Sequence, residues 1–304
     1  MKKQFCMIVS FFVVAWYGSV SSMAQPMTLY CHGVCGDSSQ INDYEGLIVG
    51  PCVALDFPDT IKPKGLSLNR IIHSVCRKMG KYHVNREKMF MGHADDVTTI
   101  HQQINPEQDY ILFGLCRGGA AIVNYIAEYN PSNVLALVLD EAPANMCDII
   151  GYREEYKNQR RKKRKKTLTP TQQKQIFRFY FPAYPEDAIP PVDNIPSIEN
   201  KDLVIFLSYA TQDSTFHFPA STLKMYQGFK KAGFKHVYLC QLNEAGQAAQ
   251  GENKLIYLQR LHSVYKKYGL PHNPEYAILD DAELQYLQPS YDEACDRLAM
   301  YCKI

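Results

Sequence analysis

A glycine-rich turn between a continuous apolar run and a helical pattern constrains the fold more than any other feature. Residues 110–113 are apolar without interruption, which is typical of a central parallel strand covered on both faces. The segment Gly114-Leu115-Cys116-Arg117-Gly118-Gly119 follows directly, and residues 120–129 predict a helix that ends before Pro131. Small residues let such a helix pack close to the sheet, so we expect Cys116 on a tight strand-to-helix turn.

Other apolar runs alternate with amphipathic segments along most of the chain. A helix is predicted after Asp95, and two more at residues 221–231 and 253–268. Further buried strands are predicted at residues 27–32, 52–57, 134–139, 203–208 and 237–242. Strands that alternate with helices indicate an α/β fold with a doubly wound, mostly parallel sheet, whose ligands bind at the carboxyl ends of the strands.

Residues 1–24 have the pattern of a cleavable signal peptide. Lys2 and Lys3 precede an apolar stretch at residues 5–17, and Ser22-Met23-Ala24 places small residues at the two positions that a signal peptidase recognises. The stretch is short for a helix that spans a bilayer; an uncleaved N-terminal anchor is the alternative. We therefore expect a secreted or periplasmic protein whose mature chain begins at Gln25.

The predicted strands divide the mature chain into four parts. Residues 25–140 and 201–270 are predicted to form the two halves of the sheet core. Residues 141–200 hold no strand pattern and are predicted to form a lid-like insertion, with a basic run from Arg160 to Lys166. Residues 271–304 are predicted to form a short helical tail, in which Ser290 and Glu293 have the spacing of a capping box.

Charge and cysteine spacing narrow the possible partners. Lys2 and Lys3 supply the formal net charge of +2, so the mature protein is near neutral and no nucleic-acid partner is predicted. The basic run is predicted to be a solvated lid segment; contact with an anionic membrane surface, or with the acidic residues around Asp280, is the alternative. Cysteine spacings match neither a haem attachment site nor a zinc finger, and no metal or cofactor is predicted.

The turn at residues 114–119 resembles the nucleophile elbow of the α/β-hydrolase family, which reads Gly-x-Ser-x-Gly. Cys116 occupies the serine position, as in members that resemble dienelactone hydrolase, and the helix N-terminus behind it favours the thiolate. His32-Gly33-Val34 resembles the family's His-Gly loop, in which His32 has a structural role. The resemblance implies an oxyanion hole formed by the backbone N–H groups of Val34 and Arg117, and a sheet of about eight strands.

The acid of the family's catalytic triad has a counterpart in this sequence. Residues 203–213 resemble the strand and loop that carry it, and Asp213 occupies the family's position in the order nucleophile, acid, base. A loop aspartate that caps a turn is the alternative interpretation. Asp140 and Glu141, which follow the preceding strand, are the fallback acids.

The catalytic histidine of the family has no counterpart. It belongs in the loop after the last core strand, and the loop at residues 243–251 contains no histidine. Gln247 matches the expected position best, with Gln250 second, and glutamine cannot accept a proton at neutral pH. Among the later histidines, only His217, in the loop after Asp213, is a fallback base.

Two functions are consistent with this pattern. The first is a thiol-dependent hydrolase for an ester, a lactone or a related acyl substrate, with Cys116 as nucleophile and Asp213 as acid. A cysteine tolerates the loss of a base better than a serine, because part of it ionises unaided. The second is a catalytically inactive binding protein that retains the pocket for a small-molecule ligand.

Overall fold

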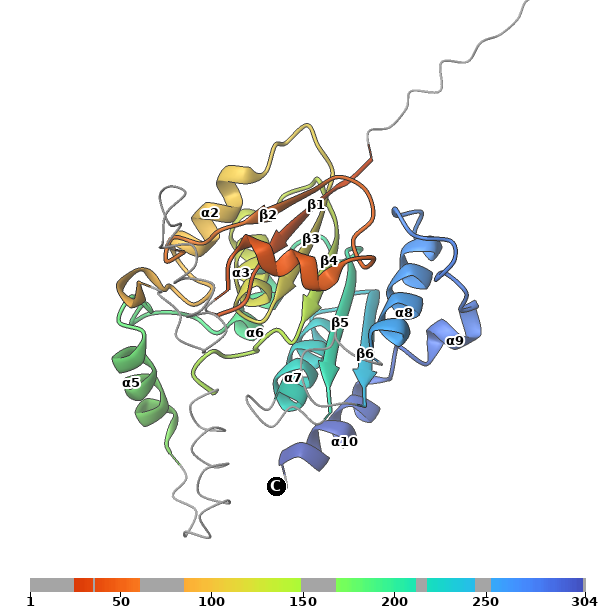
Figure 1. Cartoon of the computed structure of the whole chain (residues 1–304). Helices are drawn as coiled ribbons and strands as arrows, with labels where there is room; N and C mark the ends of the chain where they lie inside the picture. The colour runs from red at the N-terminus through yellow and green to blue at the C-terminus, as the bar shows by residue number, and fades with distance from the viewer. Residues whose placement is uncertain are drawn as a thin grey trace, which may run out of the picture.

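A six-stranded parallel sheet forms the centre of the molecule (Figure 1). The computed structural model describes residues 25–34, 36–60, 85–148, 168–211, 218–243 and 253–302. In spatial order the strands are β2 (Cys52–Leu55), β1 (Met27–Cys31), β3 (Tyr110–Leu115), β4 (Val134–Asp140), β5 (Val204–Ala210) and β6 (His236–Leu242), and every neighbouring pair is parallel. The chain moves outward from β1 to β2, then returns to β3 and continues the other way, so the strand order reverses between β1 and β3. Ligands of open α/β sheets bind at such a reversal.

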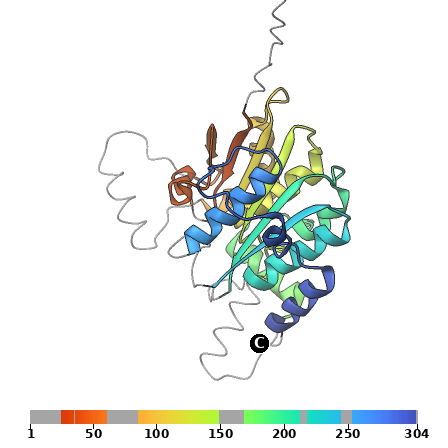
Figure 2. The same ribbon diagram turned by 90° about the vertical axis from the view of Figure 1, so that its right-hand side faces the viewer.

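Helices cover both faces of the sheet (Figures 1 and 2). One apolar core lies under α2 (Asp95–Gln103), α3 (Arg117–Tyr129), α6 (Pro191–Asn194), α7 (Phe218–Lys231) and α10 (Tyr291–Cys302), together with the 3-10 helix η3 (Ile195–Ser197). The opposite core lies under η1 (Ser38–Tyr44), α8 (Asn253–Lys267) and α9 (Asp281–Gln285). Two covered faces explain why the strand residues are almost uniformly buried, as the uninterrupted apolar runs predict.

The predicted doubly wound α/β class is confirmed, with three differences in detail. The parallel sheet has six strands in the part of the chain that the structure describes, rather than about eight. Ala94, not Asp95, is the N-cap of α2, because the turn takes Ala94 to φ 44° and leaves Asp95 as the first helical residue. Helix α3 begins at Arg117, three residues before the predicted start, because Gly118 and Gly119 are tolerated where the helix meets the sheet.

The region predicted as a lid-like insertion contains helices and no strand in its described residues, 141–148 and 168–200. Helix α5 (Pro170–Tyr180) lies at the edge of the molecule, apart from the sheet (Figure 1), and buries Phe177 against Met89 and Met91. The predicted signal peptide and the basic run from Arg160 to Lys166 lie outside the described residues.

The C-terminal tail carries the predicted capping box. Ser290 N–H donates to Glu293 Oε2 over 2.7 Å, and Glu293 N–H donates to Ser290 Oγ over 3.2 Å, which confirms the motif. Helix α10, which these contacts begin, packs against α7. None of the helices in the described ranges is long and apolar enough to cross a membrane.

The glycines at the start of α3 are required by close approach. A Cβ on Gly118 would overlap the Cys31 carbonyl at the end of β1. A Cβ on Gly119 would lie 3.2 Å from the Gly114 carbonyl oxygen near the end of β3, and 2.6 Å from Ala142 Cβ. Helix α3 therefore touches the sheet where β1 and β3 end.

Substitution of Gly118 tests this packing. Gly118→Ala should lower the free energy of unfolding by at least about 2 kcal/mol, because the methyl group meets backbone that cannot rotate away. Urea denaturation followed by circular dichroism measures the loss. Gly233→Ala provides a control at a positive φ of 85° with no atom within 4 Å of the added Cβ, and should show only the smaller cost of backbone strain. Equal losses in the two variants would contradict the close-approach argument.

Candidate active site

Cys116 lies on a strained turn between β3 and α3. Its φ of 48° and ψ of −110° are unusual for a residue with a side chain. The Cys116 N–H donates to the Asp140 carbonyl over 2.7 Å, which ties the turn to the end of the neighbouring strand β4. Such strain persists where the surrounding structure over-determines it, and it is common at functional sites.

The predicted oxyanion loop runs beside Cys116. Cys31, the last residue of β1, pairs with Gly114 in register, so the loop that begins at His32 leaves the sheet next to the elbow. A Cβ built on Gly33 would lie 3.7 Å from Cys116 Cβ. Val34 follows in a turn that the hydrogen bond from Gly36 N–H to the Gly33 carbonyl closes over 3.3 Å. The backbones of the two predicted donors, Val34 and Arg117, thus belong to segments that meet at the strand-order reversal.

His32 is held as a structural residue. It is completely buried, its Nδ1 lies 2.8 Å from the Gly33 carbonyl, and its Nε2 accepts from Phe57 N–H over 3.2 Å. Burial lowers the pKa of His32, and the Arg117 guanidinium lowers it further. A neutral ring with both nitrogens engaged cannot also serve as the base for Cys116.

The remaining predicted site residues lie outside the described residues. These are Asp213, His217 and Gln247, and the second glutamine, Gln250, is also among them. Strands β5 and β6, which precede these residues in the chain, end at the same edge of the sheet, where Thr211 N–H donates to the Leu242 carbonyl over 2.8 Å. His236 begins β6 at the opposite, amino-terminal edge, as predicted. His262 lies on α8, with its Nε2 2.8 Å from the Gly46 carbonyl.

The two fallback acids are both buried beside the elbow. Asp140 is completely buried and accepts hydrogen bonds of 2.6 Å from the Tyr44 and Ser208 hydroxyls; the Tyr257 hydroxyl lies 3.1 Å from Ser208 Oγ. Burial raises the pKa of Asp140 to about 6, although both hydrogen bonds oppose this shift. With both oxygens engaged, the Asp140 side chain supports the end of the sheet.

Glu141, the other fallback acid, is 2% exposed and has a φ of 50°. Its N–H donates to the Ser208 carbonyl over 2.9 Å. The bend at this residue ends β4 directly beside the elbow.

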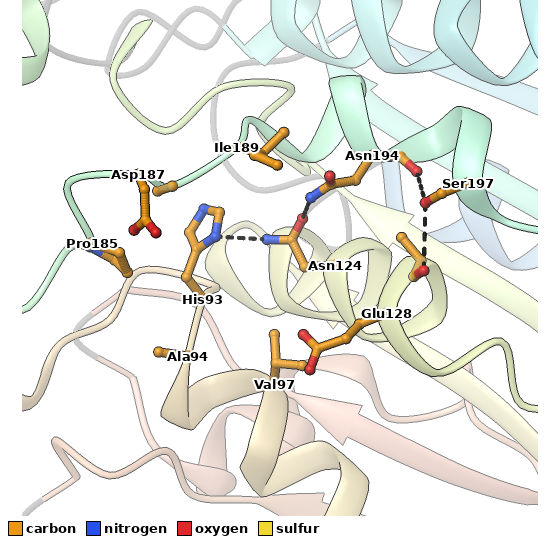
Figure 3. A pocket seen from close by; sticks show the side chains of 12 residues that line it. His93, Ala94, Val97, Asn124, Glu128, Pro185, Asp187, Ile189, Asn194 and Ser197 are labelled. Atoms are coloured by element: carbon orange, nitrogen blue, oxygen red, sulfur yellow. Dashed lines mark hydrogen bonds between the residues drawn. The ribbon is translucent and has the colours of Figure 1, made fainter.

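The sequence did not indicate a second polar site, a cavity of about 370 Å³ that lies between α2, α3 and residues 185–197 (Figure 3). Asn124 donates from Nδ2 to the Gly92 carbonyl over 2.8 Å and lies 3.3 Å from His93 Nδ1, and its Oδ1 accepts from Asn194 over 2.9 Å. Burial lowers the pKa of His93 to about 4, so its ring is neutral. None of the predicted site residues that the structure describes lines this cavity. No local pattern in the sequence indicates this site, because His93 and Asn124, which lie together in it, are 31 positions apart in the chain.

No cluster of three or more His, Cys, Asp or Glu side chains suited to a metal ion occurs within the described ranges. Cys31, Cys52, Cys116, Cys147, Cys240 and Cys295 all carry thiols rather than disulfides.

The overall arrangement of strands and helices has counterparts among solved structures. No family model matches the sequence, and no curated protein does. The Pyrococcus furiosus esterase Pf2001 is similar with a TM-score of 0.50 at 14% identity, over 81% of this chain and 82% of the esterase. The acylaminoacyl peptidase of Pyrococcus horikoshii has a TM-score of 0.50 at 12% identity, over 88% of this chain and 40% of the peptidase. The chain therefore has the fold of the α/β-hydrolase superfamily, as the elbow and the His-Gly loop predict.

The raised pKa of Asp140 makes the free energy of unfolding depend on pH. The folded protein retains this proton from the ordinary pKa of 3.8 up to about 6, where the unfolded chain has lost it. Raising the pH through this window therefore lowers the free energy of unfolding, by on the order of 3 kcal/mol. Asp140→Asn removes the ionisation, so the wild type should lose about this much relative to the variant between pH 4 and pH 7.

Urea denaturation at a series of pH values measures the difference. Substitution of the exposed Asp109 by Asn provides the control, and its curve should run parallel to that of the wild type. Parallel curves for Asp140→Asn as well would show that the carboxyl titrates normally.

Proposed function

We propose that the protein hydrolyses an ester, a lactone or a related acyl substrate, with Cys116 as the nucleophile. The observation that carries the proposal is the backbone of Cys116, which holds a thiol in a strained turn at the strand-order reversal, with the His-Gly loop beside it. The esterase and the acylaminoacyl peptidase with similar folds support an acyl substrate.

The chemistry follows the usual two steps of covalent catalysis. The Cys116 thiolate attacks the acyl carbonyl, and the charge that develops on the oxygen is stabilised by the N–H groups of Val34 and Arg117. Collapse expels the alcohol, which takes up a proton, and leaves a thioester on Cys116. Water then hydrolyses the thioester, which returns the thiol and releases the carboxylic acid. Asp213 is the proposed acid, and His217 the fallback base.

An inactive binding protein is the second candidate. The observation that favours it is the glutamine-containing loop at residues 243–251, where Gln247 replaces the expected histidine. A glutamine at that position cannot act as a general base.

Selective alkylation tests whether Cys116 is an activated thiol. Iodoacetamide at mildly acidic pH should modify Cys116 before the half-buried Cys52 and the buried Cys31, Cys147 and Cys240. Burial raises the pKa of Cys52 and of Cys240 to about 11 and raises those of Cys31 and Cys147 as well. A protonated thiol reacts slowly. Peptide mass spectrometry over time gives the order. The half-buried Cys295 is the internal reference, and modification of Cys116 no faster than Cys295 would contradict activation.

Restoration of the missing histidine tests the proposed reaction. Gln247→His should complete a Cys–His–Asp arrangement and raise the hydrolysis of an activated ester by about 10²–10⁴-fold, the usual contribution of a general base. The rate of p-nitrophenol release from p-nitrophenyl acetate measures the gain, and a further Cys116→Ala substitution should abolish it. Gln250→His controls for the register of the loop.

The outcomes separate the two candidates. If neither histidine raises the rate, His217→Ala is compared with the wild type. A loss of the residual rate would identify His217 as the base. Unchanged background hydrolysis would leave the inactive binding protein as the better description.

A further inference from the structure

The side chain of Arg117, the residue after the proposed nucleophile, is completely buried between two carboxylates. Its Nε and Nη2 donate to the Asp96 oxygens over 2.8 and 2.6 Å, a bidentate pair, and its Nη1 forms an ion pair of 2.7 Å with Asp59. Both aspartates are also completely buried, and the guanidinium carbon lies 4.6 Å from the centre of the Phe57 ring. With no exposed surface, the Arg117 side chain cannot contact a substrate directly.

These contacts join the elbow to two other segments. Asp96 belongs to the first turn of α2 and also accepts the Gly92 N–H over 2.7 Å. Asp59 belongs to the loop after β2, and that loop holds His32, because Phe57 N–H donates to His32 Nε2 and the Thr60 hydroxyl lies 3.3 Å from the same nitrogen. The Phe57 ring also packs edge-on against the His32 ring.

Arg117 is the counter-ion of two buried carboxylates. Burial raises the pKa of Asp96, whereas the guanidinium and the Gly92 N–H oppose that shift. Loss of Arg117 would leave two buried carboxylates without a counter-ion, which is strongly destabilising because their charges would be buried and uncompensated. A lysine keeps the charge but cannot form the bidentate and lateral contacts together, because the ammonium is a point charge without the planar fork.

We propose that Arg117 is a positioning residue that holds both oxyanion donors in place. Its contacts with Asp96 fix the first turn of α3, which presents the Arg117 N–H. Its contact with Asp59 fixes the loop of Phe57 and thereby His32, two residues before Val34. This inference rests on the proposed function, and it assigns Asp59 and Asp96 the same role as indirect supports of the transition state.

The test compares two conservative variants in the wild type or in Gln247→His, whichever hydrolyses the ester through Cys116. Arg117→Lys should lower kcat about 10- to 10²-fold, because a displaced donor loses part of its stabilisation of the oxyanion, with little change in KM. Asp59→Asn, which keeps the shape and removes one charge, should act in the same direction and carries the test if Arg117→Lys does not fold. Arg178→Lys, in a partly exposed ion pair, and Asp202→Asn, in an exposed one, repeat these changes and should leave kcat unchanged.

A second readout separates positioning from general damage. Alkylation of Cys116 by iodoacetamide needs the thiolate but no oxyanion hole, so its rate should stay within about twofold of the parent while kcat falls. Equal losses in alkylation and kcat would show that the elbow itself is disrupted, and would overturn the inference.

The remaining outcomes are also decisive. A folded Arg117→Lys or Asp59→Asn with the parent kcat would overturn the positioning role and leave the proposed function intact. No Cys116-dependent turnover in either background would overturn the proposed function, and the inference with it.

Discussion

The contact between the start of α3 and the ends of β1 and β3 is the constraint on which the candidate site depends. A helix can approach a sheet this closely only where side chains are missing, and Gly118 and Gly119 supply that space. The approach forces the chain to turn sharply at Cys116, whose positive φ is tolerated because its N–H is bonded to the Asp140 carbonyl. Tight packing and the half-buried position of Cys116 at the end of the sheet are thus two results of one turn.

Buried polar clusters support this turn from two directions. The Asp140 carboxyl accepts hydrogen bonds from the hydroxyls of Tyr44 in η1 and Ser208 in β5. Tyr44 belongs to the apolar core that α8 covers. The guanidinium of Arg117 is bonded by carboxylates from α2 and from the loop after β2. Buried polar groups of this kind contribute little net stability, but they penalise any arrangement that leaves a partner unpaired. Their proposed effect is to select one geometry for the backbone around Cys116.

Much of the fold could be predicted because its signals are local. Short stretches of sequence contain the apolar runs of all six strands, the turn around Cys116 and the capping box of Ser290 and Glu293. The start of α2 was predicted one residue late, because Asp95 is a good N-cap by type and the turn geometry falls on Ala94 instead. The preference of aspartate for the N-cap depends on residue type and does not report the φ of Ala94.

The supports of the site could not be predicted, because their partners are distant in sequence. Arg117 and Asp59 are 58 positions apart, and 96 positions separate Tyr44 from Asp140. A basic residue on an elbow is ordinarily expected at the surface, and nothing in its neighbours indicates a buried one. Only the assembled sheet brings these groups together, at the reversal of strand order.

In a site that combines a cysteine with a loop without histidine, the proposed reaction depends less on a general base and more on the oxyanion donors. A serine hydroxyl is a weak nucleophile until a base removes its proton, so the base dominates the rate. A thiol with an ordinary pKa of about 8.5 supplies a small fraction of thiolate without help, and the dipole at the start of α3 favours that form. The remaining barrier is then the charge that develops on the acyl oxygen, which only correctly placed N–H donors can stabilise. Under the proposed reaction, the groups proposed to fix the backbone, with Arg117 foremost among them, matter more than they would beside a complete triad.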